Sequence, residues 1–87
     1  MRIAEFVVEG TFESCGRGYV VARIVDPTAD FVVSPAATLG GFPVESWVDM
    51  PRARDRDGQP RLDVFGFCLR NLEARTRLRP GDRVALT

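Results

Sequence analysis

Prolines and glycines interrupt this chain so often that few stretches are long enough for a helix. The 87 residues include six prolines and eight glycines. They stand at positions 10, 16, 18, 27, 35, 40, 41, 43, 51, 58, 60, 66, 80 and 81. Proline lacks a backbone donor and glycine is unfavourable inside a helix, so the segments between them suit short strands joined by turns. We therefore expect one all-β domain that spans residues 1–87.

Alternation between apolar and polar residues indicates where the strands lie. A period of two residues is typical of a strand with one buried face. By this criterion we expect strands at residues 3–12, 19–25, 31–33, 42–50, 62–69 and 83–86, turns at 16–18, 26–28, 40–41 and 80–82, and a helical turn or loop at 71–78. Short strands at this spacing favour a small closed six- or seven-stranded antiparallel β-barrel, with a sandwich as the alternative.

The same alternation assigns side chains to the inside or the outside of the barrel. In the first strand it groups on one face Ala4, Phe6, Val8 and Phe12. We expect the interior to be filled by Phe6, Val20, Phe65 and Phe67. The opposite faces then carry an outward apolar stripe of Tyr19, Val21, Val64 and Cys68, and the alternation of residues 42–50 turns Trp47 outward as well. Such a stripe on a small protein indicates a partner, although a one-residue slip in the later strands would reverse inside and outside.

The charged residues exclude several kinds of chemistry. All twelve basic residues are arginine, there are twelve acidic residues and no lysine or histidine, and the formal net charge is zero. The missing residue types exclude Ser-His-Asp and Cys-His catalysis, a Schiff base and a phosphate-binding P-loop lysine. A net charge of zero also disfavours tight, sequence-independent binding of nucleic acid. We therefore expect a non-enzymatic protein that uses no cofactor.

Two cysteines, Cys15 and Cys68, lie far apart in the sequence. Their separation matches neither a compact metal-ligand motif nor a disulfide-rich scaffold, so we expect free thiols and no metal site. The N-terminal residues contain no apolar core of signal-peptide length, and no run approaches the roughly 20 apolar residues of a membrane helix. These features predict a cytoplasmic protein that does not act at a membrane.

Four segments carry a resemblance to a known family. They are residues 6–12, residues 16–24 with the turn Gly16-Arg17-Gly18, residues 63–71 and residues 78–86. In this order and at these separations they resemble the second domain, a β-barrel, of elongation factor Tu and related translational GTPases. The resemblance covers almost the whole chain. It implies a stand-alone barrel, because the sequence contains no GTPase domain.

In elongation factor Tu this barrel helps to hold the aminoacylated end of transfer RNA. Val44-Glu45-Ser46-Trp47 is similar to the start of a family segment that contributes a glutamate and an adjoining basic residue to that task. The chain then departs from the family, because Val48 and Asp49 stand where basic residues are expected. The resemblance therefore implies the barrel fold, and this function is not carried over with it.

Expected exposure selects the candidate contact residues. For a protein partner they are Trp47, Tyr19, Arg17 and Glu45, and for RNA they are Arg52, Arg54 and Arg56. Tryptophan leads the first group because it is enriched among interface hot spots. The favoured function is a protein-interaction or assembly module, with a homodimer as the most economical assembly. The alternatives are a ribosome- or transfer-RNA-associated accessory that binds RNA, and an enzyme that uses the carboxylates of Glu45 and Asp49.

Overall fold

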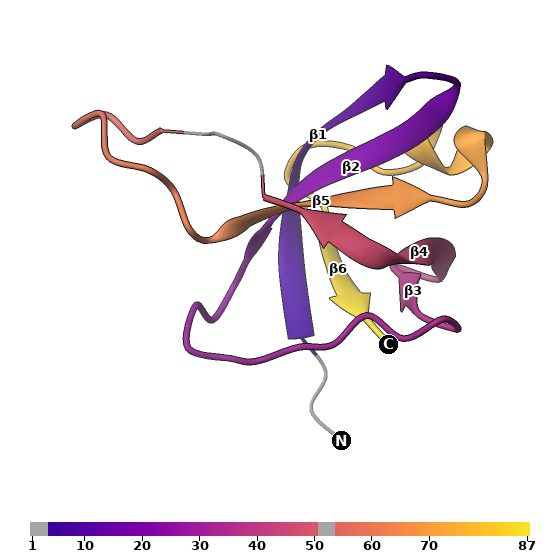
Figure 1. Ribbon diagram of the computed structural model, residues 1–87, viewed down its shortest axis with the longest axis horizontal. Coiled ribbons are helices and arrows are strands. Elements are labelled where there is room, and N and C mark those ends of the chain that lie inside the picture. The colour runs from indigo at the N-terminus through magenta and orange to yellow at the C-terminus, as the bar shows by residue number, and fades with distance from the viewer. Residues whose placement is uncertain (1–3, 51–53) are drawn as a thin grey trace.

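The computed structural model describes residues 4–50 and 54–87, and within them six antiparallel strands close into a barrel (Figure 1). The strands are β1 (Ala4–Ser14), β2 (Arg17–Ile24), β3 (Thr38–Leu39), β4 (Phe42–Asp49), β5 (Val64–Leu69) and β6 (Arg83–Leu86). Around the barrel they follow the order β1-β2-β5-β4-β3-β6, and β6 pairs again with β1. The expected closed antiparallel β-barrel is therefore confirmed.

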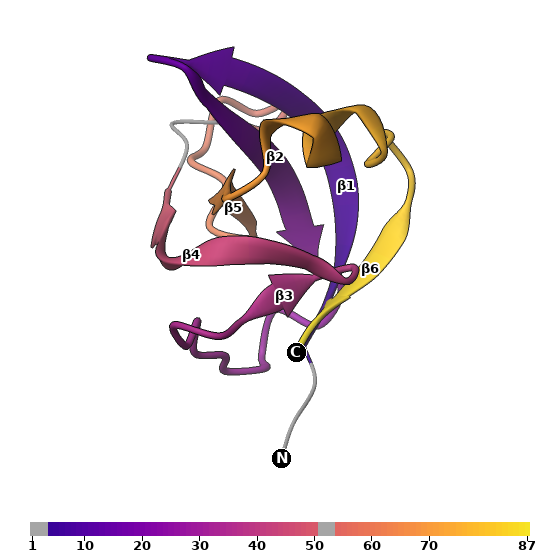
Figure 2. The same ribbon diagram turned by 90° about the vertical axis from the view of Figure 1, so that its right-hand side faces the viewer.

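A short 3-10 helix, η1 (Leu72–Thr76), connects β5 to β6 at the place where the sequence predicts a helical turn. The side chain of Asn71 accepts a hydrogen bond from the main-chain N–H of Glu73 and so caps the start of η1. Figure 2 shows η1 lying across the end of the barrel near the β1–β2 hairpin. Ala74 of η1 and Leu78 after it are buried and close this end of the core.

The barrel interior is centred on a group of phenylalanine rings. Phe6 and Phe67 are fully buried, and their ring centroids lie 5.1 Å apart in an edge-to-face arrangement. Phe31 packs edge-on against Phe6 at 5.2 Å and against Phe65 at 4.9 Å. Val20 is fully buried as predicted, whereas Phe65 is half-buried at the rim of this cluster. Edge-to-face contacts of this kind stabilise a core beyond the area that they bury.

A β-bulge in β1 overturns the predicted position of Phe12. Val8 pairs with Ala22 and Gly10 pairs with Val21, so β1 has one more residue than β2 in this interval. An extra residue moves every later side chain of the strand to the opposite face. Ala4, Phe6 and Val8 are therefore buried as predicted, but Phe12 points outward and is 45% exposed.

The turn between β1 and β2 lies earlier than predicted. Cys15 and Gly16 form it, with φ of 53° and 75°, and Ser14 pairs with Arg17 across the hairpin. Two consecutive residues with positive φ are typical of a type I′ turn, which matches the twist of antiparallel strands. Gly18, which the sequence assigns to the turn, is buried in β2 against η1.

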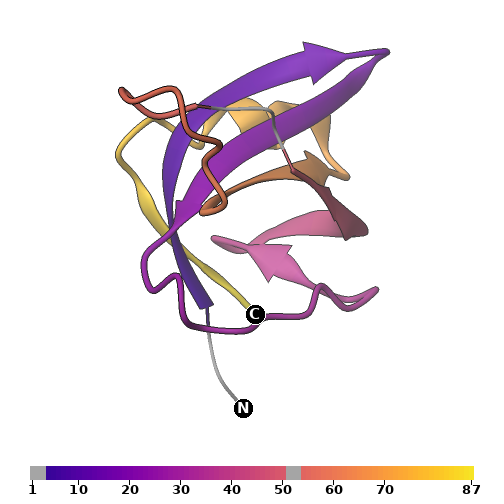
Figure 3. The same cartoon turned by 60° about the vertical axis from the view of Figure 1, so that its left-hand side comes forward.

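The strand predicted at residues 31–33 is wrong. This segment belongs to a long connection between β2 and β3 that runs across the end of the barrel where the C-terminus lies (Figure 3). No strand pairs with it among the residues that are described. Phe31 packs into the core while Val32 is 86% exposed, so the alternation that suggested a strand reflects one ring inserted from a loop.

Val64 and Cys68 of β5 face outward as predicted, but both are buried, so the exposure expected of the stripe is wrong at these two residues. Val64 pairs with Arg23. Arg23 and Arg61 both form ion pairs with Glu9, and Arg61 donates two hydrogen bonds of 2.9 and 2.7 Å to its carboxylate. These hydrogen bonds raise the pKa of Arg61 above its ordinary value. Arg23, which pairs with Val64, thus belongs to an ion-pair network with Glu9 and Arg61 on the outer side of the barrel.

The β3–β4 turn provides a test of the fold. Gly40 and Gly41 have φ of 61° and 88°, as the predicted bend requires, but a Cβ at Gly40 would lie 2.9 Å from Val84 Cγ1, whereas Gly41 has open space around it. We expect Gly41→Ala to lower the free energy of unfolding by about 1 kcal/mol through backbone strain alone. Gly40→Ala should cost about 2–3 kcal/mol because overpacking against Val84 adds to that strain. Urea unfolding of both variants measures the difference, and equal losses would contradict the close packing of the turn on β6.

Candidate functional site

The structure brings the four predicted partner-binding residues to one outer face of the barrel. Arg17 and Tyr19 lie on β2, and Glu45 and Trp47 lie on β4. β5 separates these strands and is antiparallel to both, so β2 and β4 run in the same direction. The four side chains therefore flank the outer face of β5 from its two sides.

Three aromatic side chains form a continuous row across this face, which we call the aromatic row: Phe12, Tyr19 and Trp47. The rings of Phe12 and Tyr19 are stacked, with centroids 5.0 Å apart and planes 9° apart. Tyr19 and Trp47 are in tilted contact at 6.1 Å, above the strand that lies between them. Phe12 is 45% and Trp47 37% exposed, so the outward orientation predicted for Trp47 is confirmed.

Sequence reasoning missed Phe12 as a member of this face, because the bulge reverses the alternation of β1. A signal was present, since an isolated glycine inside a strand pattern often marks a bulge. Gly10 is that glycine, and the register shifts between it and Val8.

The aromatic row covers the thiol of Cys68. Cys68 pairs with Tyr19 and is only 2% exposed, whereas Cys15 at the tip of the β1–β2 hairpin is exposed. The pKa of Tyr19 is raised above its ordinary value of 10, mainly because the surrounding protein desolvates the phenol and further because the Cys68 thiol lies beside it. The upward shift only adds to the ordinary preference of a tyrosine hydroxyl for its protonated form at neutral pH.

Charged side chains border the aromatic row at one end. Arg17 and Glu45 line a pocket of about 240 Å³ together with Arg70. The Glu45 carboxylate lies 3.9 Å from Arg70 Nε, and Arg70 also donates hydrogen bonds to the carbonyls of Val44 and Pro35. Arg17 has no ion pair or side-chain hydrogen bond with any residue that the structure describes. This end of the face thus offers one free cation and one loosely paired carboxylate.

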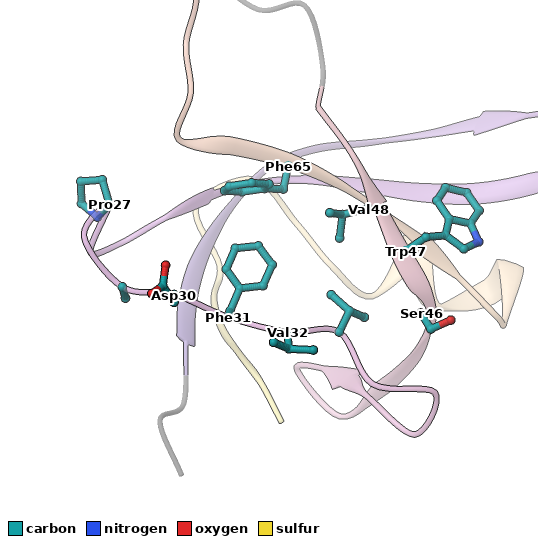
Figure 4. Close-up of a pocket in the computed structure, with 10 residues that line it drawn as sticks. Pro27, Asp30, Phe31, Val32, Ser46, Trp47, Val48 and Phe65 are labelled. Carbon is teal, nitrogen blue, oxygen red and sulfur yellow. The ribbon is translucent and has the colours of Figure 1, made fainter.

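A groove opens on the other side of Trp47, between β4 and the connection that carries Phe31 (Figure 4). Its volume is about 570 Å³. Apolar side chains dominate its lining, which consists of Pro27, Ala29, Asp30, Phe31, Val32, Val33, Ser46, Trp47, Val48 and Phe65. Figure 4 shows Asp30 near Pro27 at one end of the groove and Trp47 at the other. Trp47 therefore belongs to both the aromatic row and the groove.

Of the three arginines predicted to contact RNA, the structure describes Arg54 and Arg56, and neither is part of this face. Arg52 lies outside the described residues. Arg54 donates a hydrogen bond of 2.7 Å to the carbonyl of Gly58, and Arg56 is exposed. Figure 1 shows the segment from residue 54 to residue 60 projecting from the barrel on the side opposite η1.

Neither a cluster of potential metal ligands nor a membrane-spanning helix is present among the described residues. Among them, no three histidine, cysteine, aspartate or glutamate side chains are grouped so that they could hold a metal ion. Likewise, no helix within residues 4–50 and 54–87 is long and apolar enough to cross a membrane. Compared with family models, curated proteins and solved structures, the chain matches none of them.

Shielding of Cys68 can be measured with a thiol-specific disulfide reagent. In the folded protein we expect Cys15 to react rapidly and Cys68 slowly, since the reagent needs an accessible thiolate. Trp47→Ala should speed the reaction of Cys68 at least several-fold by opening the aromatic row. Leu62→Ala is the matched control, because Leu62 is an exposed apolar residue outside the aromatic row and its loss should leave the rate unchanged. Rapid reaction of both thiols in the unaltered protein would contradict the proposed shielding.

Proposed function

We propose that this barrel is a non-enzymatic protein-interaction module that self-associates through the outer face of β2, β5 and β4. The observation that carries the proposal is the aromatic row, in which two large rings remain exposed although they are in mutual contact through Tyr19. Aromatic side chains that are already packed lose little conformational freedom on binding, and tryptophan and tyrosine dominate interface hot spots.

The arrangement of charges favours a second copy of the chain as the partner. β2 and β4 flank β5 at comparable distances and run in the same direction. A two-fold axis parallel to β5 would therefore place β2 of one copy opposite β4 of the other. Tyr19 would then face Trp47 across the interface, and the unpaired Arg17 would face Glu45. Each charge contact would occur twice, so the face is complementary to itself.

We further infer that the barrel is related in fold to domain II of elongation factor Tu. The motif segments support this inference, because they lie in β1, β2, β5 and β6 in the family order. The segment Val44-Glu45-Ser46-Trp47 lies in β4, with Glu45 and Trp47 on the proposed contact face. In this proposal the face binds protein. The family's site for the aminoacylated end of transfer RNA then has no counterpart on this face.

Binding of RNA through the barrel and the arginine loop stays a prediction. The carboxylate of Asp55 accepts hydrogen bonds from the main-chain N–H groups of Asp57 and Gln59, so acidic residues are built into this loop beside Arg54 and Arg56. This mixture reduces the positive field that phosphates require. If RNA does bind there, its affinity should fall steeply with salt.

Light scattering tests self-association. We expect twice the mass of the single chain, with little dependence on salt because apolar contacts dominate the interface. Trp47→Ala should shift the protein to the mass of a single chain. Val32→Ala is the matched control, because Val32 is an exposed apolar residue outside the face. A single-chain mass for the unaltered protein at high concentration would sink the proposal.

A charge exchange tests the orientation of the two copies. Arg17→Glu should weaken the dimer by about tenfold or more, since it places two carboxylates opposite each other. Combining it with Glu45→Arg restores the opposite charges, so the double variant should regain most of the affinity. Sedimentation measures the three dissociation constants. If the two substitutions weaken the dimer additively in the double variant, this orientation of the two copies is excluded. A dimer with another orientation would remain compatible with that result.

A further inference from the structure

One edge of β4 is open beside the groove. β3 pairs with β4 only at Phe42 and Pro43, and the main-chain N–H of Val44 adds one bond to the carbonyl of Ala37. From Glu45 to Asp49, no strand lies on this side of β4 in the described part of the chain. An uncovered strand edge offers main-chain donors and acceptors to an incoming segment.

Next to this opening, the side chain of Arg70 connects β4 to the β2–β3 connection by hydrogen bonds. Its Nε donates to the carbonyl of Val44 and its Nη2 donates to the carbonyl of Pro35, at 3.2 and 2.7 Å. A side chain therefore joins β4 to the β2–β3 connection where no strand pairing does so. Beyond this bridge the connection and β4 separate, and the groove occupies the space between them.

The groove combines apolar walls with a single charge. Phe31, Val48 and Phe65 line it and pack against the barrel core. Asp30 is the only charged residue in the lining, and it forms no ion pair within residues 4–50 and 54–87. A ligand that fits both features carries apolar groups and a cation.

We propose that the groove binds an extended peptide of alternating apolar and basic residues, which adds a strand to the open edge of β4. Side chains of a strand alternate between its two faces, so apolar residues would enter the groove while a basic residue reaches the carboxylate of Asp30. Main-chain hydrogen bonds to β4 would supply affinity, and the apolar and charged contacts would supply selectivity. This binding does not require the dimer proposed above, because the groove lies on the other side of Trp47.

The single tryptophan of the chain provides the readout, since Trp47 lines the groove. The probe is an acetylated and amidated hexapeptide of alternating valine and arginine, titrated at low salt while tryptophan fluorescence is recorded. We expect a saturable change. The same peptide with every main-chain amide N-methylated has no N–H to donate from either edge, so it cannot pair with β4 as a strand and should bind at least tenfold more weakly.

Two aspartate variants locate the binding site. Asp30→Asn should weaken binding of the arginine peptide by about two- to fivefold, the size expected for an exposed ion pair. Asp49→Asn is the matched control, because Asp49 lies at the outer end of β4 beside the contact face and does not line the groove. If Asp49→Asn lowers the affinity for the peptide and Asp30→Asn does not, the peptide binds at the aromatic row and the proposal is overturned.

The remaining outcomes are equally decisive. Equal affinity of the N-methylated peptide would exclude strand addition, and no saturable binding up to about 1 mM would exclude the docking site itself. Repeating the titration on Arg17→Glu, at a protein concentration where its weakened dimer is dissociated, separates the two proposals. Unchanged peptide binding in that variant means that the groove functions whether or not the chain self-associates.

Discussion

The barrel depends on a central strand that is buried on both faces. The inner side of β5 packs against the phenylalanine cluster through Phe67, while its outer side is covered by long side chains that reach over it from β2 and β4. A strand between two such layers must be apolar throughout, which explains why Val64 and Cys68 are apolar although they face outward. The aromatic row is therefore a structural cover for β5 as well as an exposed surface. Its position on the outside of the barrel follows from the need to shield that strand.

The number of paired residues between neighbouring strands differs greatly around the barrel. β1, β2 and β5 are joined by long antiparallel ladders, whereas β3 contributes two residues and meets β6 through a single pair, Leu39 with Leu86. Two main-chain hydrogen bonds between Thr38 and Thr87 reinforce that pair. The short β3 leaves most of β4 uncovered, so the groove arises from the same irregularity that allows a long connection to cross the end of the barrel. A longer β3 would fill this opening and remove the free edge.

The sequence predicted the fold class, the faces of β2 and the outward position of Trp47, because each rests on a local period or turn. It indicated the bulge only through the isolated Gly10, because the alternation of apolar residues continues unbroken to Phe12, whose side the bulge changes. It could not distinguish a ring inserted from a loop, such as Phe31, from one on a strand. Burial of Cys68 under Tyr19 depends on how far a neighbouring side chain reaches across the sheet, and alternation within one strand contains no such information.

The indole of Trp47 lies at the boundary between the outer face and the groove, so a partner on the proposed contact face and a peptide in the proposed groove site would touch the same ring. Any occupant of one surface that fixes or turns the ring changes the free energy of binding at the other. Linkage makes such an effect reciprocal, so a ligand that strengthens assembly threefold is itself held threefold more tightly by the assembled form. A small barrel without moving domains would in this way couple oligomerisation to ligand concentration through one side chain.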